Sequence, residues 1–316
     1  MSVVRVPTLL TNPLRPAILA AARSPHIERA ITGVPITKGL VDRFVAGPTR
    51  VDVIEAVGKL LDSGRAVSVD FLGEDTTDAE GARAAVQEYL DLIADLPHDT
   101  HQVEVSLKLS ALGCGVANGK TVAAENARTV CAAAQAAGVW VTVDAEDHTT
   151  TDSRMAIVAE LRADFPWLGV VVQSYLRRTE QDCRELSGSG SRVRLCKGAY
   201  SEPASVAYQD QRDVDAAYLR CLEILFDGAG YPMVASHDPA MIAAVDPLVR
   251  RRGRGEYEHQ MLFGIRDAEQ LRLVNEGRQV RVYVPYGTEW YGYFMRRLAE
   301  RPSNLRFFLR SLMTED

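Results

Sequence analysis

One complete strand, helix and strand unit occupies residues 66–112. AVSVDFLG, residues 66–73, and VEVSLKLSAL, residues 103–112, are short apolar runs rich in β-branched side chains and bounded by turn residues, as is typical of buried strands. Between them, residues 78–96 are rich in Ala, Leu, Glu and Arg, which favour a helix. This order predicts a right-handed crossover between two parallel strands.

The same unit recurs to the end of the chain. Six more strand-like runs follow at 139–147, 168–176, 192–200, 231–238, 257–265 and 279–287, with helix-like segments at 121–137, 152–164 and 208–228. Eight strands alternating with helices predict an α/β fold that closes into a (β/α)8 barrel of the TIM type. An open doubly wound sheet is the alternative. It is disfavoured because Gly73, Glu74 and Asp75 follow the first strand in place of a glycine-rich nucleotide-binding turn.

The first part of the chain lies outside this rhythm. Residues 1–65 have the character of helices separated by Gly33, Pro35 and Gly47, Pro48. We therefore expect an N-terminal helical arm at 1–65 and a barrel domain at 66–316. The length of 316 residues suits a barrel, commonly about 250 residues as one domain, with additional helices.

Charge and composition exclude several classes of protein. The formal net charge is −6 and the basic residues are scattered, so no nucleic-acid footprint is indicated. The five cysteines lack metal-site or disulfide spacing and fit a reducing cytosol, so we expect no metal. No apolar run approaches the roughly 18 residues of a membrane span. The expected location is cytoplasmic. The cluster Arg250, Arg251, Arg252 and Arg254 is interpreted as a solvated helix end, with peripheral contact to the inner face of the cell membrane as the alternative.

Polar residues gather near the carboxyl ends of the predicted strands, which is where barrel enzymes carry their sites. The residues concerned are Lys108, Asp144, Glu146, Asp147, Gln173, Arg194, Lys197, Ser236, His237 and Tyr283. A buried lysine is costly without a partner, so Lys108 is expected either to meet a carboxylate such as Asp144 or to line a solvated pocket. Gly198 and Ala199 would permit close backbone approach to a pyrophosphate or a flat ring. The surplus of positive charge suggests a phosphorylated cofactor beside the substrate.

A polar stripe marks the predicted last helix. Tyr293, Arg296, Arg297 and Glu300 fall at i, i+3, i+4 and i+7 on one helical face. Two adjacent guanidinium groups suit a carboxylate, so the stripe indicates a small anionic substrate. The alternative is a solvated face on which Glu300 pairs with Arg296.

These motifs resemble those of monofunctional bacterial proline dehydrogenases over residues 66–304. The resemblance is carried by SLKLSAL (106–112), VDAED (143–147), VVQSYLRR (171–178), RLCKGAY (194–200) and WYGYFMRRLAERPSN (290–304). It implies FAD, oxidation of L-proline to Δ1-pyrroline-5-carboxylate by hydride transfer from C5 to flavin N5, and a membrane quinone as electron acceptor. This is the first step of proline catabolism to glutamate. No aldehyde dehydrogenase segment follows, so a separate pyrroline-5-carboxylate dehydrogenase is expected downstream. Cys196 and Ser236 are conservative departures from the usual family spelling.

The resemblance also implies roles for single residues. Arg296 and Arg297 would clamp the proline carboxylate together with Lys108, and Tyr200, Tyr283 and Tyr293 would wall the pocket. Arg194 would lie beside flavin N5, and Asp144 would hold the neighbouring charges in place. The remaining cofactor contacts would come from Ala145, Gln173, Lys197, Gly198, Ala199, Ser236 and His237. Holding the ring at the correct distance and face would be the main contribution of the protein.

Two other interpretations remain open at this stage. Lys108 or Lys197 could be the reactive lysine of a Schiff-base lyase on the same barrel. The barrel could also bind a small anion or a flavin without turnover. A flavin spectrum that responds to L-proline would separate the three interpretations.

Overall fold

The computed structural model describes residues 18, 41–73, 76–98, 101–253 and 256–300. The chain divides into two compact units, one of residues 42–290 and one that combines residues 1–41 with 291–316. The domain boundary expected at residue 65 stays a prediction.

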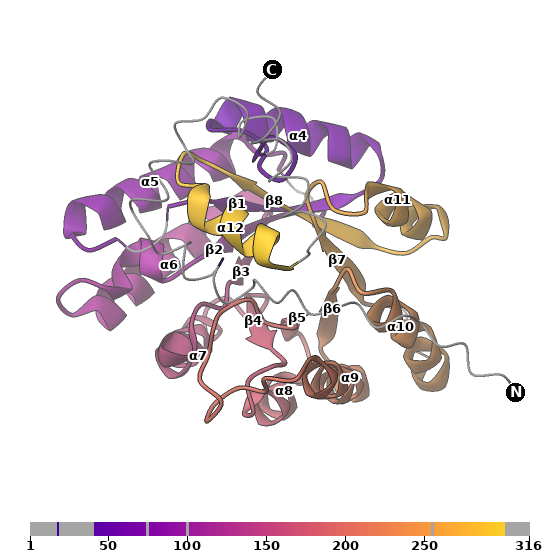
Figure 1. Cartoon of the computed structure of the whole chain (residues 1–316). Helices are drawn as coiled ribbons and strands as arrows, with labels where there is room; N and C mark the ends of the chain where they lie inside the picture. The colour runs from indigo at the N-terminus through magenta and orange to yellow at the C-terminus, as the bar shows by residue number, and fades with distance from the viewer. Residues whose placement is uncertain (1–17, 19–40, 74–75, 99–100, 254–255, 301–316) are drawn as a thin grey trace, which may run out of the picture. The chain divides into compact units, whose positions relative to one another are not determined.

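The first unit is a closed barrel of eight parallel strands in the order β1 to β8 (Figure 1), which confirms the predicted fold and excludes the open sheet. The strands are β1 (Ala66–Phe71), β2 (Val103–Leu107), β3 (Trp140–Val143), β4 (Gly169–Gln173), β5 (Arg192–Cys196), β6 (Tyr231–Ala235), β7 (Glu258–Leu262) and β8 (Val280–Tyr286). Each falls within one of the eight segments expected from the sequence.

Helices alternate with these strands. They are α4 (Arg50–Asp62), α5 (Ala79–Asp95), α6 (Gly119–Ala137), α7 (Thr151–Leu161), α8 (Thr179–Leu186), α9 (Gln211–Asp227), α10 (Pro239–Arg252) and α11 (Asp267–Asn275). A single turn of π-helix, Ser110–Cys114, follows β2, and a short 3-10 turn, His148–Thr150, precedes α7. The second unit contributes α12 (Tyr291–Glu300).

Local sequence explains where the helices begin and end. Asp78 and Asp210 accept hydrogen bonds from the free amides of the first turns of α5 and α9. Thr49 and Asp52 form a capping box at the start of α4. Gly253 ends α10 in the left-handed region, so Arg250 and Arg251 of the basic cluster lie at a helix end, while Arg254 lies outside the described residues.

The seam between the first and last strands is covered by a helix from ahead of the barrel. α4 packs on both β1 and β8 (Figure 1), and the segment before it is tied to β8 by the amide of Ala46, 2.9 Å from the carbonyl oxygen of Pro285. Val53, Val57 and Leu60 form the buried face of this helix. The barrel wall is therefore completed by a segment of the expected N-terminal arm.

The strands have two different faces. Val67, Val69, Val103, Val105 and Leu107 belong to the hydrophobic core shared with the surrounding helices, and alternate positions carry polar side chains that contact one another across the barrel. The interior is therefore polar where most such barrels are filled with branched aliphatic side chains. That polar interior leads to the candidate site.

Candidate active site

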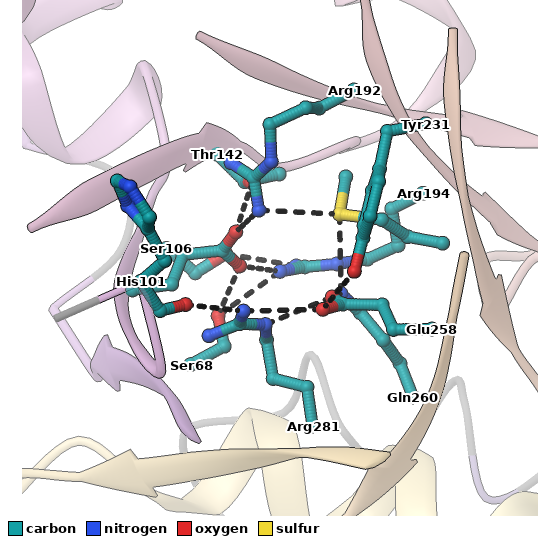
Figure 2. A network of polar contacts seen from close by, with 12 residues as sticks. Ser68, His101, Ser106, Thr142, Arg192, Arg194, Tyr231, Glu258, Gln260 and Arg281 are labelled. Carbon is teal, nitrogen blue, oxygen red and sulfur yellow. Dashed lines mark hydrogen bonds and ion pairs between the residues drawn. The ribbon is translucent and has the colours of Figure 1, made fainter. Parts of the chain in front are cut away.

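Arg194 lies at the centre of the interior. Its Nη1 atom donates to Asp144 Oδ1 at 2.7 Å and to Ser106 Oγ at 2.9 Å, and Nη2 donates to Ser68 Oγ at 3.0 Å and to Glu104 Oε1. These partners come from β1, β2 and the end of β3, and Figure 2 shows the guanidinium crossing the barrel to meet the two serines. The Nε atom is buried and has no hydrogen-bond partner among the residues that the structure describes.

Asp144 joins Arg194 to Tyr283. The hydroxyl of Tyr283, on β8, donates to Asp144 Oδ2 at 2.7 Å, and the Arg194 guanidinium lies 5.4 Å from the Tyr283 ring centroid. Burial raises the pKa of Tyr283 well above its usual range, and the carboxylates of Asp144 and Asp70 add to this rise. Tyr283 therefore stays a neutral hydrogen-bond donor. Asp144 thus bonds to both Arg194 and Tyr283, and its expected role beside a cofactor stays a prediction.

The charge of Arg194 is retained despite its burial. Burial alone would lower the pKa of the guanidinium, but the carboxylates of Glu104 and Asp144 outweigh that effect and raise it. The pKa of Glu104 is lowered, because Arg192, Arg194 and Arg281 outweigh the effect of its own burial. The pair is thus fully ionised inside the barrel.

Lys108 meets a carboxylate, as the cost of burying an ammonium requires. The partner is Asp70 on β1, whose Oδ1 lies 2.6 Å from Lys108 Nζ. Asp144, the partner suggested from the sequence, instead accepts from Arg194 and Tyr283. The sequence analysis did not name Asp70. This residue lies just before the last residue of β1, and Lys108 lies just after the last residue of β2.

Residues after β5 and β6 form a second polar group. Lys197 Nζ donates to Asp215 at 2.6 Å and to Asp238 at 2.7 Å. Ser236 Oγ accepts from the amide of Asp238, and His237 Nε2 accepts from the amide of Leu262 at 2.9 Å. Lys108, Arg194 and Lys197 all have carboxylate partners. The surplus of positive charge expected at the mouth is therefore offset, for these three residues, by Asp144 and by four acids that the sequence analysis did not name, Asp70, Glu104, Asp215 and Asp238.

The segment after β5 makes a close backbone approach at Gly198. Its φ is +114°, and a Cβ there would lie 2.3 Å from the ring of Tyr175, so only glycine fits. Ala199 and Tyr200 follow directly. On the neighbouring strand, Gln173 Nε2 donates to the carbonyl oxygen of Glu146 at 2.9 Å, which brings it beside the Asp144 and Ala145 segment. These predicted residues thus border the same end of the barrel.

The predicted polar stripe does lie on a helix. Tyr293, Arg296 and Arg297 fall within α12, and the Arg297 guanidinium lies 5.0 Å from the Tyr293 ring centroid. The side chain of Glu300 lies outside the described residues. Since α12 belongs to the second unit, its role as a clamp stays a prediction.

The polar interior below the mouth was missed by the sequence analysis. It consists of Ser68, Glu104, Ser106, Thr142, Arg192, Tyr231, Glu258, Gln260 and Arg281, whose hydrogen bonds Figure 2 displays. The sequence did contain a signal for this polar interior. Ser68 and Asp70 alternate with apolar residues in β1, and Glu104, Ser106 and Lys108 alternate with apolar residues in β2 and just after it. In a sheet covered on its outer face, such alternation indicates a polar interior.

The chain is similar to known proteins over most of its length. Residues 53–310 match the family described as proline dehydrogenase. The chain belongs to the proline dehydrogenase family. It is 37% identical over 310 residues to "Proline dehydrogenase" of Deinococcus radiodurans, covering 95% of this chain and 97% of that protein. It is 36% identical over 273 residues to "Proline dehydrogenase 1" of Bacillus subtilis (strain 168), covering 86% and 90%.

Solved structures support the fold. The chain is similar, with a TM-score of 0.76 and 23% identity, to proline utilization A (PutA) from Bdellovibrio bacteriovorus inactivated by N-propargylglycine. The likeness covers 89% of this chain but 36% of that one, so this proline dehydrogenase spans about a third of the length of its structural neighbour.

Membership of this family makes the chain an oxidoreductase that oxidises proline in proline catabolism. It also disfavours the lyase, and the two candidate lysines agree, since both form ion pairs whereas a Schiff base needs a neutral amine. Within the described part of the chain, no helix combines the length and apolar character needed to cross a bilayer.

Proposed function

We propose that this proline dehydrogenase uses FAD to oxidise L-proline to Δ1-pyrroline-5-carboxylate and passes the electrons to a membrane quinone. The observation that carries the proposal is the hydrogen bonding of the Arg194 guanidinium group. Its terminal nitrogens are held by two carboxylates and two hydroxyls, while its buried Nε–H has no partner in the described part of the chain. A buried donor of this kind calls for an acceptor.

The residues around Arg194 fit a flavin. Gly198 itself is explained by the ring of Tyr175, which occupies the place of a Cβ, so the fit rests on the buried Nε–H of Arg194 and not on space at this glycine. The contacts proposed for the ribityl and diphosphate groups are Lys197, Gly198, Ala199, Ser236 and His237, with Gln173 and Ala145 at the flavin edge. Lys197 already forms ion pairs with Asp215 and Asp238. Its ammonium group would therefore interact with these two carboxylates and with a diphosphate at the same time.

FAD, when bound, would supply the two-electron acceptor, taking hydride from proline C5 at its N5 atom. The chain supplies charge and position. Arg194 would place a fixed positive charge where negative charge develops. Asp144 holds Arg194 with one carboxylate oxygen and accepts from Tyr283 with the other, so the tyrosine that would wall the pocket is oriented by the same group.

Substrate recognition is proposed to rest on a carboxylate clamp. Arg296 and Arg297 would bind the proline carboxylate together with Lys108, because paired guanidinium forks suit that group. Tyr200, Tyr283 and Tyr293 would enclose the pyrrolidine ring. A quinone acceptor would require contact with a membrane, for which the exposed Arg250 and Arg251 at the end of α10 are candidates.

An absorption spectrum tests the cofactor and the substrate together. The purified protein should show a flavin spectrum that bleaches under anaerobic conditions with L-proline and not with D-proline. N-Propargylglycine, which inactivates the structural neighbour, should inactivate this chain with a permanent change in that spectrum. A colourless protein that stays unresponsive after FAD is added would overturn the proposal.

The clamp needs its own test. Arg296→Met and Arg297→Met should each raise KM for proline while the flavin stays bound. Lys108→Ala should slow flavin reduction without releasing FAD. Because this change removes a partner of buried Asp70, the matched control is Asp70→Asn combined with Lys108→Met, which removes both charges. Unchanged KM in both arginine variants would contradict the clamp.

A further inference from the structure

Glu104 is a carboxylate of the barrel interior that accepts four hydrogen bonds. It is fully buried on β2. One oxygen accepts from Ser68 Oγ at 2.7 Å and from Arg194 Nη2, and the other accepts from Thr142 Oγ1 at 2.8 Å and from Arg192 Nη2 at 2.6 Å. With two donors on each oxygen, the carboxylate cannot rotate without losing a hydrogen bond.

Arg194 is held from two sides. Each of its terminal nitrogens bonds one carboxylate and one serine hydroxyl: Nη1 meets Asp144 and Ser106, and Nη2 meets Glu104 and Ser68. Asp144 follows the end of β3 and retains some exposure, whereas Glu104 lies deeper and has none. Glu104 is thus the inner of the two anchors that set the depth and orientation of the guanidinium.

The interior charges balance. The basic groups are Lys108, Arg192, Arg194 and Arg281, and the acidic groups are Asp70, Glu104, Asp144 and Glu258, which gives four minus four, or zero. Neutralising Glu104 would leave the interior with a net charge of one positive unit, beside Arg192 and Arg194, which would have lost their shared carboxylate. Charges inside a barrel act in a medium of low dielectric and are poorly screened.

We propose that Glu104 is the positioning residue for Arg194: it fixes the guanidinium at the mouth and sets how much of its positive charge reaches a bound flavin. This inference rests on the proposed function. It goes further by assigning a role in the reaction to a side chain that touches neither substrate nor cofactor. Charge near the flavin ring tunes its electronics, so Glu104 should influence the midpoint potential.

Glu258 provides a matched control. It is also fully buried in the interior and also accepts four hydrogen bonds, two from Arg281, one from Gln260 and one from Tyr231. None of these involves Arg194. Glu258→Gln therefore removes the same charge from the same barrel without touching the Arg194 contacts (Figure 2).

The experiment compares Glu104→Gln and Glu258→Gln as full-length, flavin-loaded protein. Both variants should lose thermal stability. Glu104→Gln should move the flavin midpoint potential to more positive values, and by clearly more than Glu258→Gln does, because the positive charge that it leaves uncompensated is that of Arg194 and its neighbour Arg192. It should also lower the limiting rate of flavin reduction by L-proline about tenfold, or about 1.4 kcal/mol in activation free energy, with KM changed less than twofold.

If Glu104→Gln does not fold, Glu104→Asp provides a second test of the inference. It retains the charge and shortens the reach, so the midpoint potential should stay near that of the wild type while the limiting rate falls. Equal shifts in Glu104→Gln and Glu258→Gln would overturn the inference, as would Glu104 variants with an unchanged potential and rate. A wild-type protein without a proline-responsive flavin would instead overturn the proposed function, and this inference with it, before any variant is made.

Discussion

The two faces of the barrel wall are built on different principles. On the outer face, Val103, Val105 and Leu107 pack against helices in a continuous apolar core. On the inner face of the same strand, Glu104 and Ser106 bond to groups from other strands. The outer face derives its stability from apolar burial, which tolerates many side chains of similar size. The inner face depends on matched charges, and those charges are what the proposed reaction would use.

The largest expected loss of stability comes from breaking an inner-face ion pair. Arg281 donates to both oxygens of Glu258 and to the carbonyl oxygens of Val67, Gln102 and His101. Arg281→Met should lower the free energy of unfolding by about 3–5 kcal/mol, because it leaves a buried carboxylate without its cation. Chemical denaturation would measure this.

A double variant distinguishes charge from packing at that pair. Adding Glu258→Gln to Arg281→Met should restore part of the lost stability, since no unpaired charge then remains. A double variant less stable than Arg281→Met alone would mean that the inner face is held by packing, as the outer face is.

An outer-face cavity should cost nearly as much but leave the chemistry alone. Leu92 is fully buried on α5 within the core that covers the strands. Leu92→Ala should lower the free energy of unfolding by about 2–5 kcal/mol through lost transfer energy and a residual cavity. The rate of flavin reduction per folded molecule should match the wild type. A slower rate would show that the two faces are coupled.

His259 is a titratable exception among the outward-facing positions of β7. Burial lowers its pKa to about 4, and the nearby Arg278 contributes. The folded state therefore favours neutral imidazole. Its contribution to stability is complete above pH 6.5 and is lost as the pH falls from 6.5 towards 4, by at most about 3 kcal/mol. Thermal unfolding across this range should be flatter for His259→Asn.

The smallest expected effects are those of removing the hydroxyl of half-buried Tyr283 or of buried Tyr218. Tyr283→Phe removes the hydrogen bond to Asp144, and Tyr218→Phe removes one to the carbonyl oxygen of Leu195. Hydrogen bonds to charged groups are worth more, so we expect losses of about 1.5 and about 1 kcal/mol. The inner variant alone should change proline kinetics, by a few-fold in KM. Equal kinetics in the two variants would remove Tyr283 from the proposed pocket wall.

The outer face explains why the fold could be predicted. Runs such as AVSVDFLG carry their apolar residues in the local sequence, so the strands and the closed barrel followed from pattern alone. The inner face depends on pairing across the barrel. Arg194 meets Ser68 and Glu104 from distant parts of the chain, and no local spacing specifies such partners. Polar strand ends therefore indicated that Arg194 and Asp144 belong to a site, but not that Lys108 would meet Asp70.

The position of α4 has a consequence for synthesis of the protein. This helix and β1 leave the ribosome before the other strands of the barrel, yet both complete their packing with β8, the last of those strands to be made. Until then the nascent chain carries an unpaired strand edge at β1 and an apolar helix surface at Val53, Val57 and Leu60. Closure of the barrel must therefore wait until β8 has been made, and the growing polypeptide is exposed to aggregation throughout that interval.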